Sequence, residues 1–447
     1  MLDQRRVDYN YRSIPSREMG FHPHSFADSA GRLFAWKGEL YRGIKAESAR
    51  FFSELLNNGV IQSLIEAGLL VETEQSNLSA DGFEMVVHHK RVPFVSYPNE
   101  WCADMLKDAA LLMLDLEIEL TKRGLELKDG HPWNILFDGC KPVYVDLTSI
   151  QPARDKAVWS AYDEYCRFCY YPLILMCYGQ ERIARCLVSE YDGVRREDLS
   201  ILTRRLAFSP FLLAKILRRA SRQITRSTGR LSFLTRLKED LQKMRPPHNH
   251  HKQSDLLTQQ GGIANERALY EVLDELRPQS VLDVSGAEGS YSIQAARRAG
   301  KVVSFETDPA RVTRLYREAR KESLPILPLV MSFVKPTPSA GYSGHYAMAA
   351  TERFKCDLVL AFSLVDELVF ERYFNFELIA EGLSSFSNRW LLVEFISRED
   401  KRVSAKWGDR FAWYTLDNFI SNLRDWFHRV TILPDGAKDR ALLLCEK

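Results

Sequence analysis

Short apolar segments alternate with amphipathic stretches from about residue 260 to the C-terminus, and this alternation restricts the fold more than any other feature. The segments expected to form strands are 280–284, 301–305, 326–333, 357–362 and 390–395. Strands that alternate with helices pair in parallel, because each helix returns the chain along one face of the sheet. The sequence therefore predicts an α/β fold with a Rossmann-like sheet, closed by a β-hairpin over 428–433 and 440–445.

The first two of these strands end in residues that suit a nucleoside ligand. The segment SVLDV (280–284) is followed by the small-residue turn SGAEGS and by an expected helix over 291–299. Small side chains let the backbone approach a ligand, and free amide groups at a helix start favour negative charge. The second strand ends in Glu306, whose carboxylate can accept hydrogen bonds from two ribose hydroxyls.

From residue 260 onward the chain resembles the class I S-adenosylmethionine-dependent methyltransferases. The resemblance rests on VLDVSGAEG, VVSFETDP, DLVLAFSLVDEL and LLVEF. It implies S-adenosylmethionine as the cofactor, with Asp283 and the glycine turn at its methionine end and Glu306 at its ribose. The cofactor-binding residues expected in this way are Asp283, Ser285, Gly286, Gly289, Glu306, Asp308, Ser332 and Ser363.

The chain departs from the family pattern in this turn. Ser285 and Ala287 stand where glycines are usual, and Ser332 stands where an acid near the adenine is common. A Cβ atom restricts the backbone where unusual dihedral angles are needed. A pocket that binds the cofactor weakly or not at all is therefore the alternative.

Methyl transfer is an in-line displacement in which the protein positions the acceptor and can remove its proton. Three carboxylates that follow the fourth and fifth strands are candidate bases: Asp366, Glu367 and Glu394. The alternative is that each is a solvated loop carboxylate. Tyr414 is expected either to line the acceptor side or to pack in the core. The implied acceptor is a small molecule or a glycan.

The N-terminal half contains the segment LKDGHPWNILFDGCKPVYVDLTSI, residues 127–150. Its pattern predicts a loop, a hairpin turning at 138–139, and then Asp146. Asp129, Asn134 and Asp146 bring two carboxylates and an amide to this loop and hairpin. Hard oxygen ligands suit Mg²⁺, and a further Asp can orient or deprotonate a hydroxyl group. The segment therefore predicts a magnesium-phosphate site.

This segment resembles the catalytic loop of kinase-fold small-molecule phosphotransferases of the aminoglycoside type, H-G-D-x-H-P-x-N. The resemblance implies a protein-kinase-like α+β domain in which Asp129 is the catalytic base, Asn134 and Asp146 hold Mg²⁺, and ATP is the phosphate donor. His131 would buttress the loop. No G-x-G-x-x-G or V-A-I-K segment precedes it, and Lys45 is the best substitute for the phosphate-binding lysine. A degenerate domain that binds the acceptor or a partner is the alternative.

Several simpler elements are expected in this half. The segment 32–44 predicts a hairpin turning at Lys37-Gly38, and 84–95 predicts another strand pair. Residues 103–123 have the apolar repeat of a helix. Cys166 and Cys169 form a CxxC, which we interpret as two neighbours on one helix face rather than a metal site.

Charge is distributed unevenly, although the chain as a whole carries only +2. Residues 195–243 hold 13 Lys and Arg against four acids, or +9, which leaves −7 for the remainder. Only three aromatic residues accompany these basic residues, so stacking on nucleic-acid bases is not indicated and no nucleic-acid partner is expected. The segment is either an anionic ligand site or an exposed helical face packed beside the acidic remainder.

With 447 residues the chain is long enough for two or three domains. We expect a kinase-like domain over 1–244, a linker over 245–259 and a methyltransferase domain over 260–447. The linker's three histidines could bind a metal, although a Pro-, His- and polar-rich stretch of this kind favours a plain connection.

The compartment is expected to be the cytoplasm. The eight cysteines are scattered, which is typical of reduced thiols, and we expect no signal peptide and no membrane span.

The combined prediction is an S-adenosylmethionine-dependent methyltransferase with a kinase-like accessory domain. One alternative is a bifunctional kinase–methyltransferase of a surface polysaccharide or a hydroxylated metabolite. The other is a non-catalytic scaffold built on two degenerate domains.

Overall fold

The computed structural model describes residues 12–447 except 23–24, 26–27, 156, 204–228, 247–261, 286–288 and 435–438. Gly286, most of the basic segment and the three histidines of the expected linker lie outside the described residues.

The C-terminal part is built on a mixed sheet, in which the described residues form seven strands in the order β14-β13-β12-β15-β16-β18-β17. The strands are β12 (Ser280–Asp283), β13 (Lys301–Glu306), β14 (Ile326–Val330), β15 (Cys356–Ala361), β16 (Ser387–Ile396), β17 (Arg429–Ile432) and β18 (Arg440–Glu446). The first five are parallel, and β18 runs antiparallel between β16 and β17. The parallel sheet and the closing hairpin expected from the sequence are therefore present.

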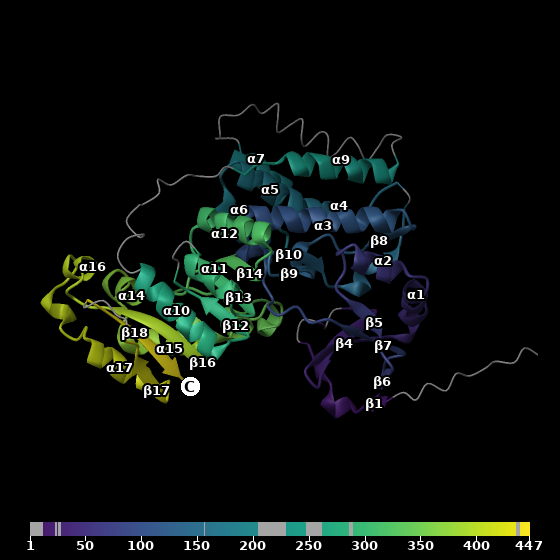
Figure 1. Ribbon diagram of the computed structural model, residues 1–447. Helices are drawn as coiled ribbons and strands as arrows, with labels where there is room; N and C mark the ends of the chain where they lie inside the picture. The colour runs from purple at the N-terminus through teal and green to yellow at the C-terminus, as the bar shows by residue number, and fades with distance from the viewer. Residues whose placement is uncertain are drawn as a thin grey trace, which may run out of the picture.

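Helices connect these strands (Figure 1). They are α10 (Gly262–Leu276), α11 (Ser290–Ala296), α12 (Pro309–Glu322), α13 (Ala350–Arg353), α14 (Val365–Phe370), α15 (Phe376–Phe386), α16 (Lys401–Ser404) and α17 (Leu416–Arg424). The start of α12 shows the local chemistry: Asp308 caps it by accepting from the Ala310 amide, and Pro309 occupies its first position. None of the described helices is long and apolar enough to cross a membrane.

The N-terminal part begins with an antiparallel sheet whose described strands have the order β2-β3-β4-β7-β5. They are β2 (Gly20–Phe21), β3 (Gly31–Trp36), β4 (Glu39–Ile44), β5 (Thr73–Gln75) and β7 (Met85–His89), and α1 (Ala46–Asn57) and α2 (Val60–Glu66) lie between β4 and β5. The expected hairpin is present, and Lys37 and Gly38 both have positive φ, as its tight turn requires.

The second strand pair expected over 84–95 was wrong. Only β7 forms there, and it pairs with β4 and β5 rather than with the residues that follow it. Pro93 has no amide hydrogen to contribute to a ladder, so the following stretch runs without strand structure.

A helical region with two small sheets follows. The helix expected over 103–123 is α3 (Ala103–Thr121). Further along the chain come α4 (Tyr162–Tyr165), α5 (Tyr171–Cys177), α6 (Glu181–Val188), α7 (Arg196–Thr203) and α9 (Arg230–Lys243), of which α5 and α9 pack on α3. The strands β8 (Leu125–Leu127) and β11 (Ile150–Pro152) pair, as do β9 (Ile135–Asp138) and β10 (Lys141–Tyr144). Cys166 and Cys169 are buried free thiols in a π-helical turn between α4 and α5.

The C-terminal part of the basic segment, α9, packs against α3. Arg230 of α9 is almost fully buried and pairs with Glu117 and Glu126, which are buried too. Burial raises the pKa of Glu117 to about 7, although Arg230 opposes this shift. Lys238 pairs with Asp115, also on α3. For α9 these contacts favour the interpretation of a basic face packed beside acidic residues.

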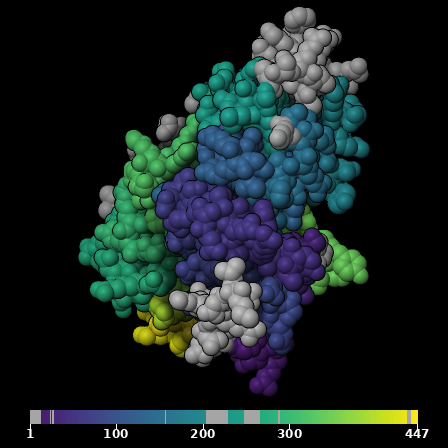
Figure 2. All heavy atoms as spheres, turned by 90° about the vertical axis from the view of Figure 1, so that its right-hand side faces the viewer, coloured from purple at the N-terminus to yellow at the C-terminus, as the bar shows by residue number. Residues whose placement is uncertain are grey.

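The two parts are packed closely together, and a hydrophobic cluster of buried side chains runs through both. Figure 2 shows the purple and blue N-terminal residues directly against the green C-terminal ones. On α12, Tyr316 donates to Asp108 of α3 at 2.7 Å and Arg317 pairs with Asp104 at 2.5 Å. The β9–β10 turn lies against the start of β14, where the Cys140 thiol donates to the Ile326 carbonyl at 3.1 Å.

Candidate functional site

The carboxyl end of β12 carries the most deeply buried acid of the C-terminal part's candidate cofactor residues. Asp283 is 1% exposed and accepts hydrogen bonds from the Ser285 amide at 2.9 Å and the Ser292 hydroxyl at 2.6 Å. Burial raises the pKa of Asp283, and these hydrogen bonds oppose the shift. The carboxylate thus ties the turn after β12 to the first turn of α11.

The turn itself uses one glycine and one serine in different ways. Gly289 has φ +81°, and a Cβ there would lie 2.7 Å from the Leu315 side chain, so the position requires glycine. Ser285 accepts a hydrogen bond from the Phe362 amide at 2.9 Å, which joins the ends of β12 and β15. A serine in place of the usual glycine therefore has a structural role here.

Glu306 ends β13, the strand beside β12. Its Oε1 atom accepts from the Asp308 amide at 2.9 Å, while Oε2 is buried and accepts no hydrogen bond from the described residues. Arg311 lies 3.5 Å from Oε2 as an ion-pair partner. Burial raises the pKa of Glu306, and the Asp308 amide and Arg311 oppose this shift. Asp308 caps α12 through its side chain.

Two serines complete the expected cofactor residues. Ser332 follows Met331, whose amide donates to the Glu306 carbonyl at 3.0 Å, so it lies beside the end of β13. Ser363 has φ +51°, an unusual value for a non-glycine residue, and both its amide and hydroxyl donate to Glu394.

The three candidate bases have different surroundings. Glu394 is 1% exposed, accepts hydrogen bonds from Asn265 and Ser363, and pairs with Arg440. Its carboxylate therefore connects three segments of the chain. Glu367 is exposed. Asp366 is 7% exposed and its Oδ1 atom has no hydrogen-bond partner among the described residues.

Burial raises the pKa of Asp366 to about 6, opposed chiefly by Arg402. Of the three carboxylates, it alone combines burial with an oxygen that has no donor. Tyr414 donates to the Ile396 carbonyl at 2.8 Å and packs in the core.

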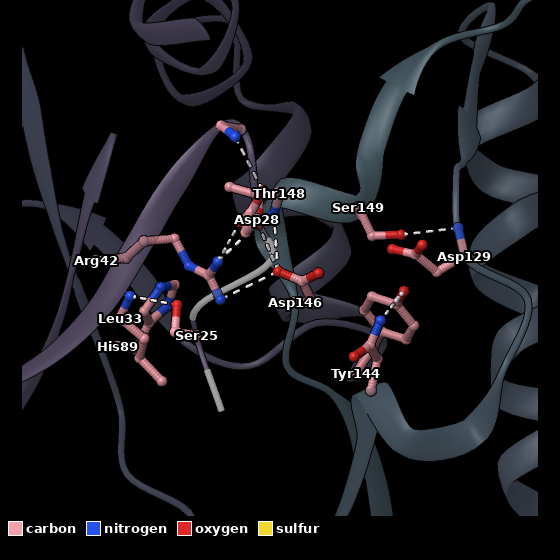
Figure 3. Close-up of polar contacts among 12 residues, drawn as sticks. Ser25, Asp28, Leu33, Arg42, His89, Asp129, Tyr144, Asp146, Thr148 and Ser149 are labelled. Atoms are coloured by element: carbon pink, nitrogen blue, oxygen red, sulfur yellow. Dashed lines mark hydrogen bonds and ion pairs between the residues drawn. The ribbon is translucent and has the colours of Figure 1, made fainter. Parts of the chain in front are cut away.

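The phosphotransferase-like segment has a site of its own, drawn in Figure 3. Asp146 accepts from the Thr148 amide and hydroxyl and pairs with Arg42 at 3.1 Å. Arg42 also pairs with Asp28 at 3.0 Å. Asp129 is not hydrogen-bonded to this cluster, and its amide donates to the Ser149 hydroxyl at 3.3 Å. Burial raises the pKa of Asp129, with a further contribution from the nearby Asp146 carboxylate.

A guanidinium therefore pairs with Asp146, one of the two residues that the sequence predicted as metal ligands. Arg42 is 7% exposed and already balances Asp146 and Asp28. Asn134, the other expected ligand, directs its amide nitrogen to the Tyr144 hydroxyl at 3.3 Å. Within the described ranges no group of three or more His, Cys, Asp or Glu side chains is arranged to hold a metal ion.

The sequence analysis did not single out Arg42 and Asp28, the two residues bonded around Asp146 and Thr148. The basic residue that it named in this half was Lys45, as a substitute for a phosphate-binding lysine. In the structure Lys45 precedes α1 as its N-cap residue, and it is Arg42, three residues earlier, that pairs with Asp146. The available signal was strand alternation: Arg42 is two residues before buried Ile44, so both point to the same side of β4.

No known family profile matches the chain. It is 24% identical over 433 residues to the nodulation protein NoeA of Rhizobium meliloti (strain 1021), which covers 89% of this chain and 90% of that protein. Among solved structures it is similar to WbdD, with a TM-score of 0.31 and 13% identity over 40% of this chain and 39% of WbdD. It is also similar to the N-methyltransferase NodS of Bradyrhizobium japonicum WM9, with a TM-score of 0.28 and 12% identity over 41% of this chain and 92% of NodS.

The chain thus spans less than half of WbdD, and overlaps at these TM-scores assign nothing by themselves. The topology is more informative. The chain proceeds outward from β12 to β14 and then returns to β15, so the strand order reverses between β12 and β15. In open α/β sheets ligands bind outside the carboxyl ends of the strands at such a switch point. Asp283 and Ser285 lie there, and Glu306 ends the neighbouring strand. The C-terminal part therefore has a Rossmann-like α/β fold, with these acids at its switch point.

Proposed function

We propose that the chain is an S-adenosylmethionine-dependent methyltransferase that acts on a small molecule or a glycan. The observation that carries the proposal is the Oε2 atom of Glu306 at the end of β13, which has Arg311 as an ion-pair partner but no hydrogen-bond donor among the described residues. Ribose hydroxyls would supply the missing donors. Asp283, which accepts from the Ser285 amide, and Gly289, at the start of α11, would hold the methionine end.

When bound, the cofactor supplies a methyl group on a good leaving group. The chain's own residues must then orient the acceptor and take up its proton. We assign the second task to Asp366, whose buried Oδ1 atom has no hydrogen-bond partner among the described residues and whose pKa of about 6 leaves it mostly unprotonated at neutral pH. Arg402, its main charge partner, keeps the carboxylate form accessible.

The N-terminal part is assigned an accessory role. Its strand order β2-β3-β4-β7-β5, with α1 after β4, supports a kinase-like lobe. The buried Arg42 argues against metal-dependent phosphotransfer, because a divalent cation at Asp146 would have to displace a paired guanidinium. The bifunctional alternative instead requires binding of Mg²⁺ with ATP.

Calorimetric titration of the full chain with S-adenosylmethionine tests the main proposal. Glu306→Ala should weaken binding at least about tenfold, since hydrogen bonds to a charged group contribute about 1.5–3 kcal/mol each. Glu318→Ala, an exposed acid on α12, is the control and should bind like the wild type. Absence of binding by the wild type at millimolar cofactor would overturn the proposal, and a parallel titration with Mg²⁺ and ATP that shows binding would favour the bifunctional alternative.

A further inference from the structure

Residues 331–349 form a long connection between β14 and α13, and they begin at the proposed ribose site. The Met331 amide donates to the Glu306 carbonyl at 3.0 Å, which fixes the first residue of the connection against the end of β13. Beyond it, regular structure is limited to a short 3₁₀ turn and one bridge between Ala340 and Ala347. Its internal backbone hydrogen bonds are concentrated in residues 340–347, so the position of the connection as a whole depends on contacts at its two ends.

The N-terminal part supplies those contacts at the far end. The Tyr97 hydroxyl accepts a hydrogen bond from the Met348 amide at 2.9 Å. Arg353, at the end of α13, donates to the Met348 carbonyl at 2.8 Å and to the Val95 carbonyl at 2.6 Å. Two elements from distant parts of the sequence therefore hold the same residue of the connection, Met348.

A buried ion pair between Arg353 and Glu100 fixes the position of Arg353. Both guanidinium nitrogens of Arg353 reach Glu100, at 3.0 and 2.5 Å, and both side chains are 1% exposed. The guanidinium also lies 4.2 Å from the centre of the Tyr97 ring. A planar, bidentate pair fixes both direction and distance, and an unpaired charge at this depth is costly, so the anchor is held in one position.

Aromatic rings extend the contact in two directions. Trp133, from the phosphotransferase-like loop, packs 5.0 Å from Tyr346 of the connection. Phe354, the residue after Arg353, packs on Phe94 at 6.3 Å and on Phe305 at 5.6 Å. Phe305 directly precedes Glu306, so the N-terminal part is linked to the ribose site through β13 as well as through the connection.

We propose that the N-terminal part shapes the cofactor site by anchoring residues 331–349, with Tyr97, Glu100 and Arg353 as positioning residues. The inference rests on the proposed function, because it concerns the affinity of the same site for S-adenosylmethionine. It gives the accessory part a task that requires no phosphotransfer. The similarity to NoeA, which extends over 89% of the chain, is consistent with two parts that work as one unit.

The test compares two tyrosine variants of the full chain. Tyr97→Phe removes the acceptor for Met348 but keeps the ring that contacts Arg353 and Trp133. Tyr316→Phe, the control, removes a hydrogen bond from the same interface between α12 and α3, at Asp108. We expect Tyr97→Phe to raise the Kd for S-adenosylmethionine about 3- to 10-fold, the range for one hydrogen bond, and Tyr316→Phe to leave it unchanged.

Two further readouts separate positioning from stability. Thermal unfolding should give similar midpoints for the two variants, and hydrogen exchange should accelerate within 331–349 only in Tyr97→Phe. If the wild type binds the cofactor and both variants bind it equally well, the inference is overturned while the proposed function stands. If the wild type does not bind, the proposed function fails and this inference fails with it.

Discussion

At the scale of single residues, Arg42 pairs with Asp146, an acid that the sequence predicted as a metal ligand. Arg42 forms hydrogen bonds or ion pairs with Asp28, Asp146 and Thr148, and its side chain is buried. A buried pair of this kind is difficult to dismantle, because removal of one partner leaves the other charge desolvated.

Arg42→Met should therefore destabilise the protein by about 3–5 kcal/mol, as urea unfolding would measure. Arg50→Met on α1 is the matched control, since its pair with Glu54 is exposed and should contribute less than about 1 kcal/mol. Equal effects of the two substitutions would contradict the interpretation of Arg42 as a buried cation.

Asp366 gives a prediction about pH. Its folded pKa of about 6 lies above the ordinary Asp value of 3.8, so the folded state binds the proton more tightly than the unfolded state does. Ionisation of Asp366 between about pH 4 and 6 therefore costs stability, on the order of 3 kcal/mol once complete. Asp366→Asn should be more stable than the wild type at pH 8 and similar to it at pH 4, as denaturant unfolding at both pH values would show. An equal difference at both pH values would rule out this account.

The acids at the ends of strands were predictable because they follow apolar runs directly in the sequence. Asp283 and Glu306 both lie where the pattern placed them. The hydrogen-bond and ion-pair partners of each carboxylate were not predictable, because they come from distant segments of the sequence. Glu394 is held by Asn265 and Arg440, and neither belongs to its own strand.

At the scale of elements, the turn between β12 and α11 combines two constraints that a sequence pattern does not distinguish. Gly289 requires positive φ, and it also requires space beside Leu315 of α12. The first constraint is local, whereas the second depends on how α12 packs. For the same reason β7 and α3 followed from local periodicity, while the pairing partners of β7 did not.

Gly289→Ala separates these constraints. Gly68 also has positive φ, but no atom lies within 4 Å of a Cβ built there. Gly68→Ala should cost about 1–2 kcal/mol from the backbone alone. Gly289→Ala should cost about 1–3 kcal/mol more from overpacking, and it should weaken cofactor binding. Equal losses in chemical denaturation would show that Leu315 moves aside freely.

At the scale of the whole molecule, α3 is an acidic helix that binds basic residues on two sides. Asp104 and Asp108 face Arg317 and Arg320 of α12, whereas Asp115 and Glu117 face α9. Basic residues of α9, which belong to the basic segment 195–243, thus form ion pairs with acidic residues of α3.

Calorimetry should accordingly show one cooperative unfolding transition. A hydrophobic cluster runs through both parts, so neither can lose its structure without exposing apolar surface of the other. We expect the calorimetric and van't Hoff enthalpies to agree for the full chain. Two resolved transitions would show that the parts unfold separately.

The contact between the β9–β10 turn and β14 has a consequence for biosynthesis. β14 is an edge strand of the C-terminal sheet, and exposed strand edges recruit other chains. The turn that meets its first residues, at Gly139 and Cys140, leaves the ribosome long before β14 does. The β9–β10 turn is therefore already synthesised when β14 emerges, and it can contact the first residues of this edge strand. A fragment made without residues 1–246 would lack that contact, and the start of its edge strand would be exposed.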